Sequence, residues 1–299
     1  MRTMSNFLGT VFDLCWTGGT LLALLKNNDD IMELWDMLTG EKLRVLERCA
    51  NFIIHLKFSP DGRLAISGSR DKAVGIWDLE TGACLHHLEK HKGAVASVCF
   101  SPDSKKALSG GDIYDRTVKL WDVKTGNCIR TIKKGINDGV YSVCFSPDGK
   151  NALLVYDGNI KIWNLASGSC IRVLSIDLTL SWNRHSEPVY ACFSPDGKQV
   201  LSANRDMMMK IWDVSIGFRL YNLKGHTHFI TSICFSPDGK LALSGSVDGT
   251  VKLWDIETAS CIQTFEDFSD PRINKVCFSP DGRQIAAATK NEVRIFNLD

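Results

Sequence analysis

One short pattern, Thr-Val-Lys-Leu-Trp-Asp at residues 250–255, recurs through the whole chain at nearly constant spacing. Its last two residues occur in seven versions: Trp35-Asp36, Trp77-Asp78, Trp121-Asp122, Trp163-Asn164, Trp212-Asp213, Trp254-Asp255 and Phe296-Asn297. Successive versions are 42, 44, 42, 49, 42 and 42 residues apart. A repeat of this length indicates seven copies of one structural unit, each of which buries its apolar surface against its neighbours.

A second pattern, Phe-Ser-Pro-Asp-Gly, keeps a fixed distance from the first. It starts at Phe58, Phe145, Phe193, Phe235 and Phe278, and at Phe100 with Ser104 in place of the glycine. Proline presets φ and glycine accepts a positive φ, so the pattern predicts a tight turn between two strands. In the sixth copy, strand patterns cover residues 229–235, 241–246, 250–254 and 260–265. Four antiparallel strands per copy, without a helical period, are typical of a propeller blade.

These patterns resemble the WD40 repeat family over the whole chain. In the sixth copy Gly225-His226, residues 235–239, residues 244–246, Asp248 and Trp254-Asp255 stand at the family's spacing. The regular turns are similar to bacterial arrays of this family. The resemblance implies an all-β, seven-bladed β-propeller that forms a single domain over residues 1–299. It also implies ring closure, in which Thr3 to Leu8 is the outer strand of the blade that contains Phe296.

Composition argues against several kinds of partner and site. There are 35 basic and 34 acidic residues, for a net charge of +1, so no global charge attracts nucleic acid or an anionic membrane. Apolar runs are too short to span a membrane and the first ten residues lack the features of a signal peptide, which predicts a cytoplasmic protein. The spacing of His87 and His91, on a strand and the loop after it, does not suit a metal site. We therefore expect no metal and no cofactor.

The eleven cysteines also follow the repeat. Five precede the marker phenylalanine and four lie seven places after the marker tryptophan, so most are repeat-equivalent and are expected to lie far apart. No Cys-x-x-Cys spacing occurs. The sequence predicts small, buried, reduced thiols that do not pair with one another.

Histidine, serine, aspartate and tryptophan recur together, which raises the alternative of a hydrolase. The resemblance instead implies a structural tetrad, in which buried polar groups satisfy one another within a blade. Active sites rarely occur in multiples, which favours the structural interpretation. Two sets are complete: His226, Ser244, Asp248 and Trp254 in the sixth copy, and His91, Ser109, Asp115 and Trp121 in the third.

Residues that the repeat does not explain are the candidates for function. In the family, two positions of the first strand and the one before the turn aspartate face the upper rim. Mapping these positions, and adding the tryptophan of the longest insertion, predicts a partner-binding surface with many tyrosine and arginine side chains, which interfaces favour. Its members are Phe52, Arg70, Tyr114, Tyr141, Tyr156, Trp182, Tyr190, Arg205, Phe229 and Arg272.

The sequence therefore predicts a non-enzymatic scaffold or adaptor, monomeric, that binds a protein or peptide on the upper face of blades three to five. Two alternatives remain open. The propeller is a sensor or regulatory domain of a larger signalling protein, or it is an enzyme whose catalytic residues are among Asp112, Asp138, Glu187 and Arg205.

Overall fold

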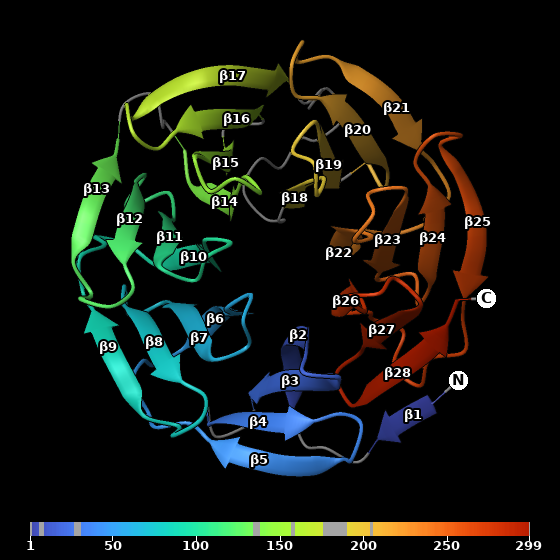
Figure 1. The fold of residues 1–299 in the computed structure, drawn as a ribbon, viewed down its shortest axis with the longest axis horizontal. Helices are drawn as coiled ribbons and strands as arrows, with labels where there is room; N and C mark the ends of the chain where they lie inside the picture. Colours follow the sequence, from blue (N-terminus) through green and yellow to red (C-terminus); the bar gives the residue numbers. More distant parts are fainter. Residues whose placement is uncertain are drawn as a thin grey trace.

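The computed structural model describes residues 2–5, 9–26, 31–133, 138–156, 159–175, 190–203 and 206–298. These residues form 28 β-strands in seven four-stranded antiparallel sheets. The sheets are arranged as blades around a central opening (Figure 1), which confirms the predicted all-β, seven-bladed propeller. Nowhere in these ranges is there a helix long and apolar enough to cross a membrane.

Each blade is a meander whose successive strands are hydrogen-bonded neighbours. Blade one contains β2 (Thr10–Thr17), β3 (Thr20–Lys26), β4 (Met32–Asp36) and β5 (Glu41–Val45). Blade two contains β6 (Ile53–Phe58), β7 (Leu64–Ser69), β8 (Val74–Asp78) and β9 (Cys84–Leu88). Blade three contains β10 (Val95–Phe100), β11 (Lys106–Gly111), β12 (Val118–Asp122) and β13 (Cys128–Ile132). Blade four contains β14 (Val140–Phe145), β15 (Asn151–Tyr156), β16 (Asn159–Asn164) and β17 (Ser169–Ser175).

Blade five contains β18 (Tyr190–Phe193), β19 (Gln199–Ala203), β20 (Met209–Asp213) and β21 (Arg219–Leu223). Blade six contains β22 (Ile230–Phe235), β23 (Leu241–Ser246), β24 (Val251–Asp255) and β25 (Ser260–Phe265). Blade seven contains β26 (Lys275–Phe278), β27 (Gln284–Ala288), β28 (Glu292–Asn297) and β1 (Arg2–Ser5). The first strand of each blade lines the central opening and the fourth lies at the outer edge (Figure 1).

The ring is closed by the N-terminal strand. β1 pairs antiparallel with β28, and Thr3 lies opposite Arg294. The predicted closure is thus confirmed, although the strand begins one residue earlier than expected. Residues 6–8 of the predicted strand lie outside the described residues.

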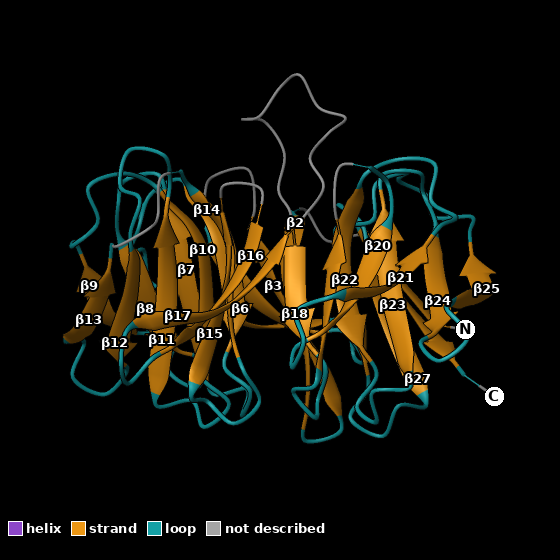
Figure 2. Cartoon of the chain, turned by 90° about the horizontal axis from the view of Figure 1, so that it is seen from above, coloured by secondary structure: helices purple, strands orange, loops and turns teal. Residues whose placement is uncertain are grey.

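Loops gather at the two edges of the ring (Figure 2). We call upper the face that carries the connections between second and third strands and between one blade and the next. The lower face carries the other turns. In the lower turn of blade six, the Ser236 hydroxyl donates to Asp238 Oδ1 at 2.6 Å and accepts the N–H of Leu241 at 2.9 Å, while Gly239 has a φ of 74°. Ser104 replaces this glycine in blade three and adopts the same left-handed backbone, with a φ of 58°.

The apolar core lies between blades rather than within them. Seven clusters of buried residues each combine side chains of two neighbouring sheets. Trp121 of blade three, for example, packs with Ile66 and Ile76 of blade two and is fully buried. The marker tryptophan therefore fills the interface with the preceding blade. This role explains why it recurs in six of the seven copies.

The expectation for the cysteines is wrong at several positions. Cys49 and Cys84 form a disulfide. The two are not repeat-equivalent, because Cys49 occupies the histidine position of blade two, so the argument from equivalent sites did not apply to them. Cys170 and Cys261 are exposed rather than buried, because they lie on the outer strands β17 and β25.

Ring closure gives the first prediction. Deleting residues 1–5 should remove the partner of β28 and expose an unpaired strand edge, so we expect a lower melting temperature and concentration-dependent aggregation. Arg2→Ala, which leaves the strand backbone in place, is the matched control. Thermal unfolding and light scattering measure both effects, and a deletion variant that melts like the parent would contradict the closure.

Candidate functional site

The sixth blade contains a chain of four hydrogen-bonded polar side chains. The Trp254 indole N–H donates to Ser244 Oγ at 2.8 Å, and Ser244 Oγ lies 2.7 Å from His226 Nε2. On the other side of the ring, His226 Nδ1 lies 2.8 Å from Asp248 Oδ2. The distances fit a neutral imidazole that accepts from the serine hydroxyl and donates to the carboxylate.

The charges of this tetrad suit a structural role. Burial lowers the pKa of His226, and the nearby Asp248 offsets this only in part. Burial alone would raise the pKa of Asp248, but hydrogen bonds from the Thr250 hydroxyl and the Thr227 N–H, with the histidine opposite, lower it to about 2. His226 is therefore uncharged at neutral pH, with both ring nitrogens occupied inside the blade. No position is left for a substrate between these groups.

Blade three contains the same four residue types, with a close contact in place of the aligned histidine–aspartate hydrogen bond. Ser109 Oγ accepts the Trp121 indole N–H at 2.8 Å and lies 2.6 Å from His91 Nε2, and His91 Nδ1 lies 3.1 Å from Asp115 Oδ1. Blade five retains the tryptophan–serine hydrogen bond, in which the indole N–H of Trp212 donates to Ser202 Oγ at 2.9 Å. Here a buried lysine replaces the histidine as the partner of the turn aspartate, with 2.6 Å between Lys210 Nζ and Asp206 Oδ2.

The tetrad gives the second prediction. Asp248→Ala should leave His226 and the Thr227 N–H without their acceptor, which costs about 1–3 kcal/mol of unfolding free energy. Glu257→Ala, at an exposed position of the same blade, is the control and should be neutral. Denaturant unfolding measures the difference, and equal stability of the two variants would contradict the structural role of the aspartate.

The predicted partner-binding residues are not all on the surface. Tyr114 is 79% exposed in the connection between β11 and β12, and Phe52 is 62% exposed just before β6. Arg70 and Arg272 are exposed as well, and Phe229 is half-buried with its ring against that of His228. These positions lie on the upper face, because each belongs to a connection at that edge.

Tyr156 does not belong to the surface, and its assignment there is wrong. It is fully buried and packs in the core between blades three and four. The connection after β15 is only two residues long, and Tyr156 lies opposite Asn159 in the ladder. The tyrosine therefore stays on the sheet and faces the neighbouring blade instead of turning out onto the rim.

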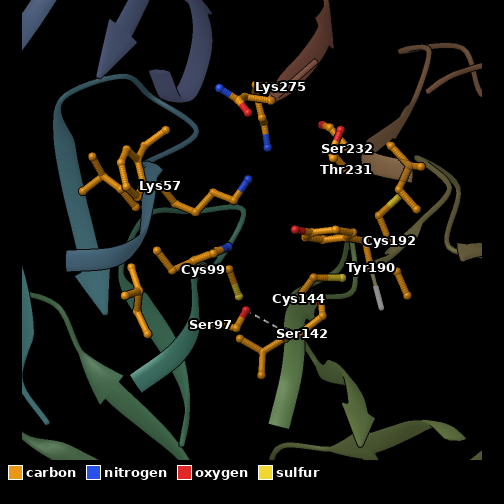
Figure 3. Close-up of a pocket in the computed structure, with 18 of the residues that line it drawn as sticks. Lys57, Ser97, Cys99, Ser142, Cys144, Tyr190, Cys192, Thr231, Ser232 and Lys275 are labelled. Carbon is orange, nitrogen blue, oxygen red and sulfur yellow. Dashed lines mark hydrogen bonds between the residues drawn. The ribbon is translucent and has the colours of Figure 1, made fainter. Parts of the chain in front are cut away.

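Tyr141 and Tyr190 are both partly buried. Tyr141 is half-buried, and its hydroxyl donates to Asp138 Oδ2 at 3.3 Å. Tyr190 points into the central channel (Figure 3), where burial raises the pKa of its hydroxyl. Trp182 and Arg205 lie outside the described residues, so their predicted place on the upper face stays a prediction.

Sequence reasoning missed a bulge that recurs in the first strands. In five blades the register shifts by one residue near the upper end of this strand. A bulge re-aims one side chain and is common beside binding sites. The bulged positions are Phe12, Ile54, Ala96, Tyr141 and Thr231, and three of them (Phe12, Ile54 and Thr231) line the channel.

In four of the five blades, the residue after the bulge joins one blade to the next across the channel wall. Ser97 accepts the N–H of Val143 at 3.1 Å, and Ser232 accepts the N–H of Val276 at 3.2 Å. Asp13 occupies this position in blade one, and its Oδ2 accepts the N–H of Phe58 at 3.0 Å. A side chain of one innermost strand thus fixes the backbone of its neighbour in sequence.

Asp13 also collects two lysines. Its Oδ1 lies 3.2 Å from Lys57 Nζ of blade two and 3.0 Å from Lys275 Nζ of blade seven. Burial opposes ionisation of this carboxyl, but the two lysines and the Phe58 N–H lower its pKa to about 2. One carboxylate therefore ties together the three blades that meet at the closure of the ring.

Comparison with protein families agrees with this geometry. The family described as WD domain, G-beta repeat matches residues 40–78, 82–122, 126–164, 176–213, 217–255 and 259–297, which is most of the chain. The chain belongs to the WD40 family. Five of the six matched segments run from just before the outer strand of one blade to the third strand of the next, and the segment from residue 176 begins just after the outer strand β17. A WD40 repeat and a blade are therefore offset by one strand.

The matched segments begin at residue 40, although the structure shows a seventh blade before it. In this first copy Trp16 stands at the marker-phenylalanine position and Gly18-Gly19 replace the Pro-Asp-Gly turn. Both glycines have positive φ, so the turn is kept with different residues. The first copy, at the point where the WD40 ring closes, therefore retains its strands although its residues depart from the repeated sequence patterns.

The thiols of the innermost strands are poor nucleophiles. Burial raises the pKa of Cys15 and Cys234 to about 12 and that of Cys144 to about 11. Protonated, buried thiols are unreactive and bind metals weakly. Over the described ranges, no three histidine, cysteine or acidic side chains are placed to hold a metal ion.

The acidic residues considered for catalysis have structural partners where they are described. Asp112 Oδ1 accepts the N–H of Tyr114 at 3.0 Å, and Asp138 Oδ1 accepts the N–H of Gly139 at 2.7 Å. Both contacts shape the loops that carry these residues. Glu187 and Arg205 lie outside the described residues.

The closure carboxylate gives the third prediction. The pKa of Asp13 falls from its ordinary 3.8 to about 2 on folding, so the ionised form stabilises the protein above pH 4 and this contribution is lost as the pH falls through 2. Asp13→Asn lacks the contribution and should be less stable than the parent at pH 7 by about 2 kcal/mol or more. This gap, the difference in unfolding free energy between the parent and Asp13→Asn, should narrow by about 1 kcal/mol as the pH falls from 5 to 3.

Denaturant unfolding at three pH values measures this gap, with Glu80→Gln at an exposed position as the control. A gap that stays constant with pH would show that the Asp13 carboxylate contributes no charge-dependent stability.

Proposed function

We propose that this WD40 propeller is a non-enzymatic adaptor that binds a protein or peptide on its upper face. Members of the family commonly serve as scaffolds for protein interactions, and the polar tetrads that resemble catalytic sets are committed within blades. The observation that carries the proposal is the exposure of Phe52 and Tyr114 in connections of the upper face, where neither ring is buried against its own blade.

Contacts join the upper surface of blade two to that of blade one. The Arg70 N–H donates to the Phe52 carbonyl oxygen at 3.1 Å, so the two residues are neighbours within blade two. Lys26 of blade one reaches the carbonyl oxygen of Ile53 at 3.5 Å and lies 5.9 Å from the Phe12 ring centroid. Aromatic rings interleaved with cationic side chains are the composition that protein interfaces favour.

The backbone conformation of Phe52 also supports the proposal, because this conformation is unfavourable for a phenylalanine. Its φ is 53°, a left-handed conformation that costs a bulky residue roughly 1–3 kcal/mol. A glycine would adopt this φ without strain. Retaining an exposed phenylalanine there is consistent with a role for the ring outside the folded chain itself.

The fourth prediction separates binding from stability. Phe52→Gly relieves the backbone and removes the ring, so the variant should unfold at the same or a higher temperature yet bind its partner roughly thirtyfold more weakly. Ala259→Gly is the matched control, since Ala259 also has a positive φ, 54°, but lies in a lower turn. Tyr114→Ala should likewise weaken binding without loss of stability.

The partner would be isolated by affinity capture with the parent protein, and its dissociation constant then measured against each variant by calorimetry. Unchanged affinity for Phe52→Gly and Tyr114→Ala, together with loss of binding on changing lower-turn residues such as Asp148 or Lys198, would place the site on the opposite face. Tyr156→Ala does not serve this test, because its buried ring makes loss of stability the expected result.

A further inference from the structure

The central channel contains a water-accessible cavity of about 290 Å³. All seven innermost strands contribute to its wall, so its shape is fixed by the ring as a whole. Lys57, Lys275 and Tyr190 point into it from three different strands (Figure 3). The lysine side chains are 28% and 19% exposed, and Figure 3 shows both directed toward the cavity.

The two ammonium groups share a single carboxylate oxygen. Each carries three N–H donors, and within the part of the chain that the structure describes Asp13 Oδ1 is the only oxygen acceptor within reach of either. The two lysine side chains also contact each other. The second oxygen of Asp13 is taken by the Phe58 N–H. Several ammonium N–H groups are therefore free to face a ligand in the cavity.

The cavity also carries an excess of positive charge. Burial, strengthened by the two lysine charges, lowers the pKa of His55 to about 3, so this imidazole is neutral. Tyr190 is neutral as well, since burial raises its pKa. Burial keeps the surrounding thiols protonated, namely those of Cys15, Cys99, Cys144, Cys192, Cys234 and Cys277. Two lysines against one aspartate leave a net charge of about +1 in a confined space.

We propose that the central channel is a binding site for a small free oxyanion, a phosphate or carboxylate group held between Lys57 and Lys275 with the Tyr190 hydroxyl as a further donor. The volume admits such a group together with a few carbon atoms. An anion here would accept hydrogen bonds from the unused ammonium N–H groups and would neutralise the excess charge. Charge-assisted hydrogen bonds of this kind are among the stronger hydrogen bonds in proteins. The inference is independent of the proposed partner on the upper face.

The protonation of Lys57 gives the site a defined pH response. Burial, together with the charge of Lys275, lowers the pKa of Lys57 to about 8, and Asp13 opposes this shift. A bound anion favours the protonated ammonium, so binding should weaken as the pH rises above 8. The site would thus hold its ligand at neutral pH and release it in alkali.

Sulfate is the probe of choice, because its charge is constant between pH 6 and pH 10. Titration calorimetry at constant ionic strength should give one site per chain for the parent at pH 7, at least tenfold weaker binding at pH 9.5, and at least tenfold weaker binding for Lys57→Met. Lys240→Met, which removes an exposed lysine from a lower turn, is the control and should bind as the parent does.

A second variant keeps the test decisive if Lys57→Met folds poorly. In Asp13→Asn the lysines lose their carboxylate, so sulfate should raise the melting temperature of this variant more than that of the parent. Equal sulfate responses of the parent, Lys57→Met and Asp13→Asn, or binding that is unchanged at pH 9.5, would overturn the proposal.

Discussion

Each four-stranded sheet of this protein has two apolar faces, and neither can be buried inside its own blade. The seven core clusters lie at the seven interfaces between blades, so the sheets are stable only as a closed ring. The marker tryptophans fill these interfaces, and β1 completes the last blade by pairing with β28. Every other property of the molecule, including the shape of its channel, depends on this closure.

Closure has a polar counterpart in the channel wall. Side chains on the innermost strands accept a backbone N–H of the next blade, and Asp13 does so while also meeting lysines of blades two and seven. At other interfaces the hydroxyl of a serine, such as Ser97 or Ser232, accepts the N–H of the next blade. At the closure of the ring, a cluster of one carboxylate and two ammonium groups takes the place of that serine. These residues hold the ring together, and in our proposal they also give the channel its affinity for anions.

The sequence predicted what is local and repeated. Turn chemistry at residues 235–239 and the tetrad of blade six depend on neighbours within one copy, so spacing was enough to place them. Tyr156 was misplaced because a two-residue connection keeps it on the sheet, a matter of strand register that spacing does not reveal. The channel cluster was missed because Asp13 and Lys275 are 262 residues apart and meet only when the ring closes. Its signal was present as charged residues at positions that hold serine (Asp13 and Lys275) or cysteine (Lys57) in other copies.

We expect the function of this protein to depend on upper-face residues that are not part of the repeated pattern. Site-specific photo-crosslinking tests this directly, because it works even when the identity of the partner is unknown. A photoreactive amino acid at position 52 or 114 should crosslink a discrete protein in cell extract, whereas the same group at position 148 or 240 in the lower turns should give only background. Crosslinks to a discrete protein from the lower positions, with none from the upper ones, would contradict an upper-face site.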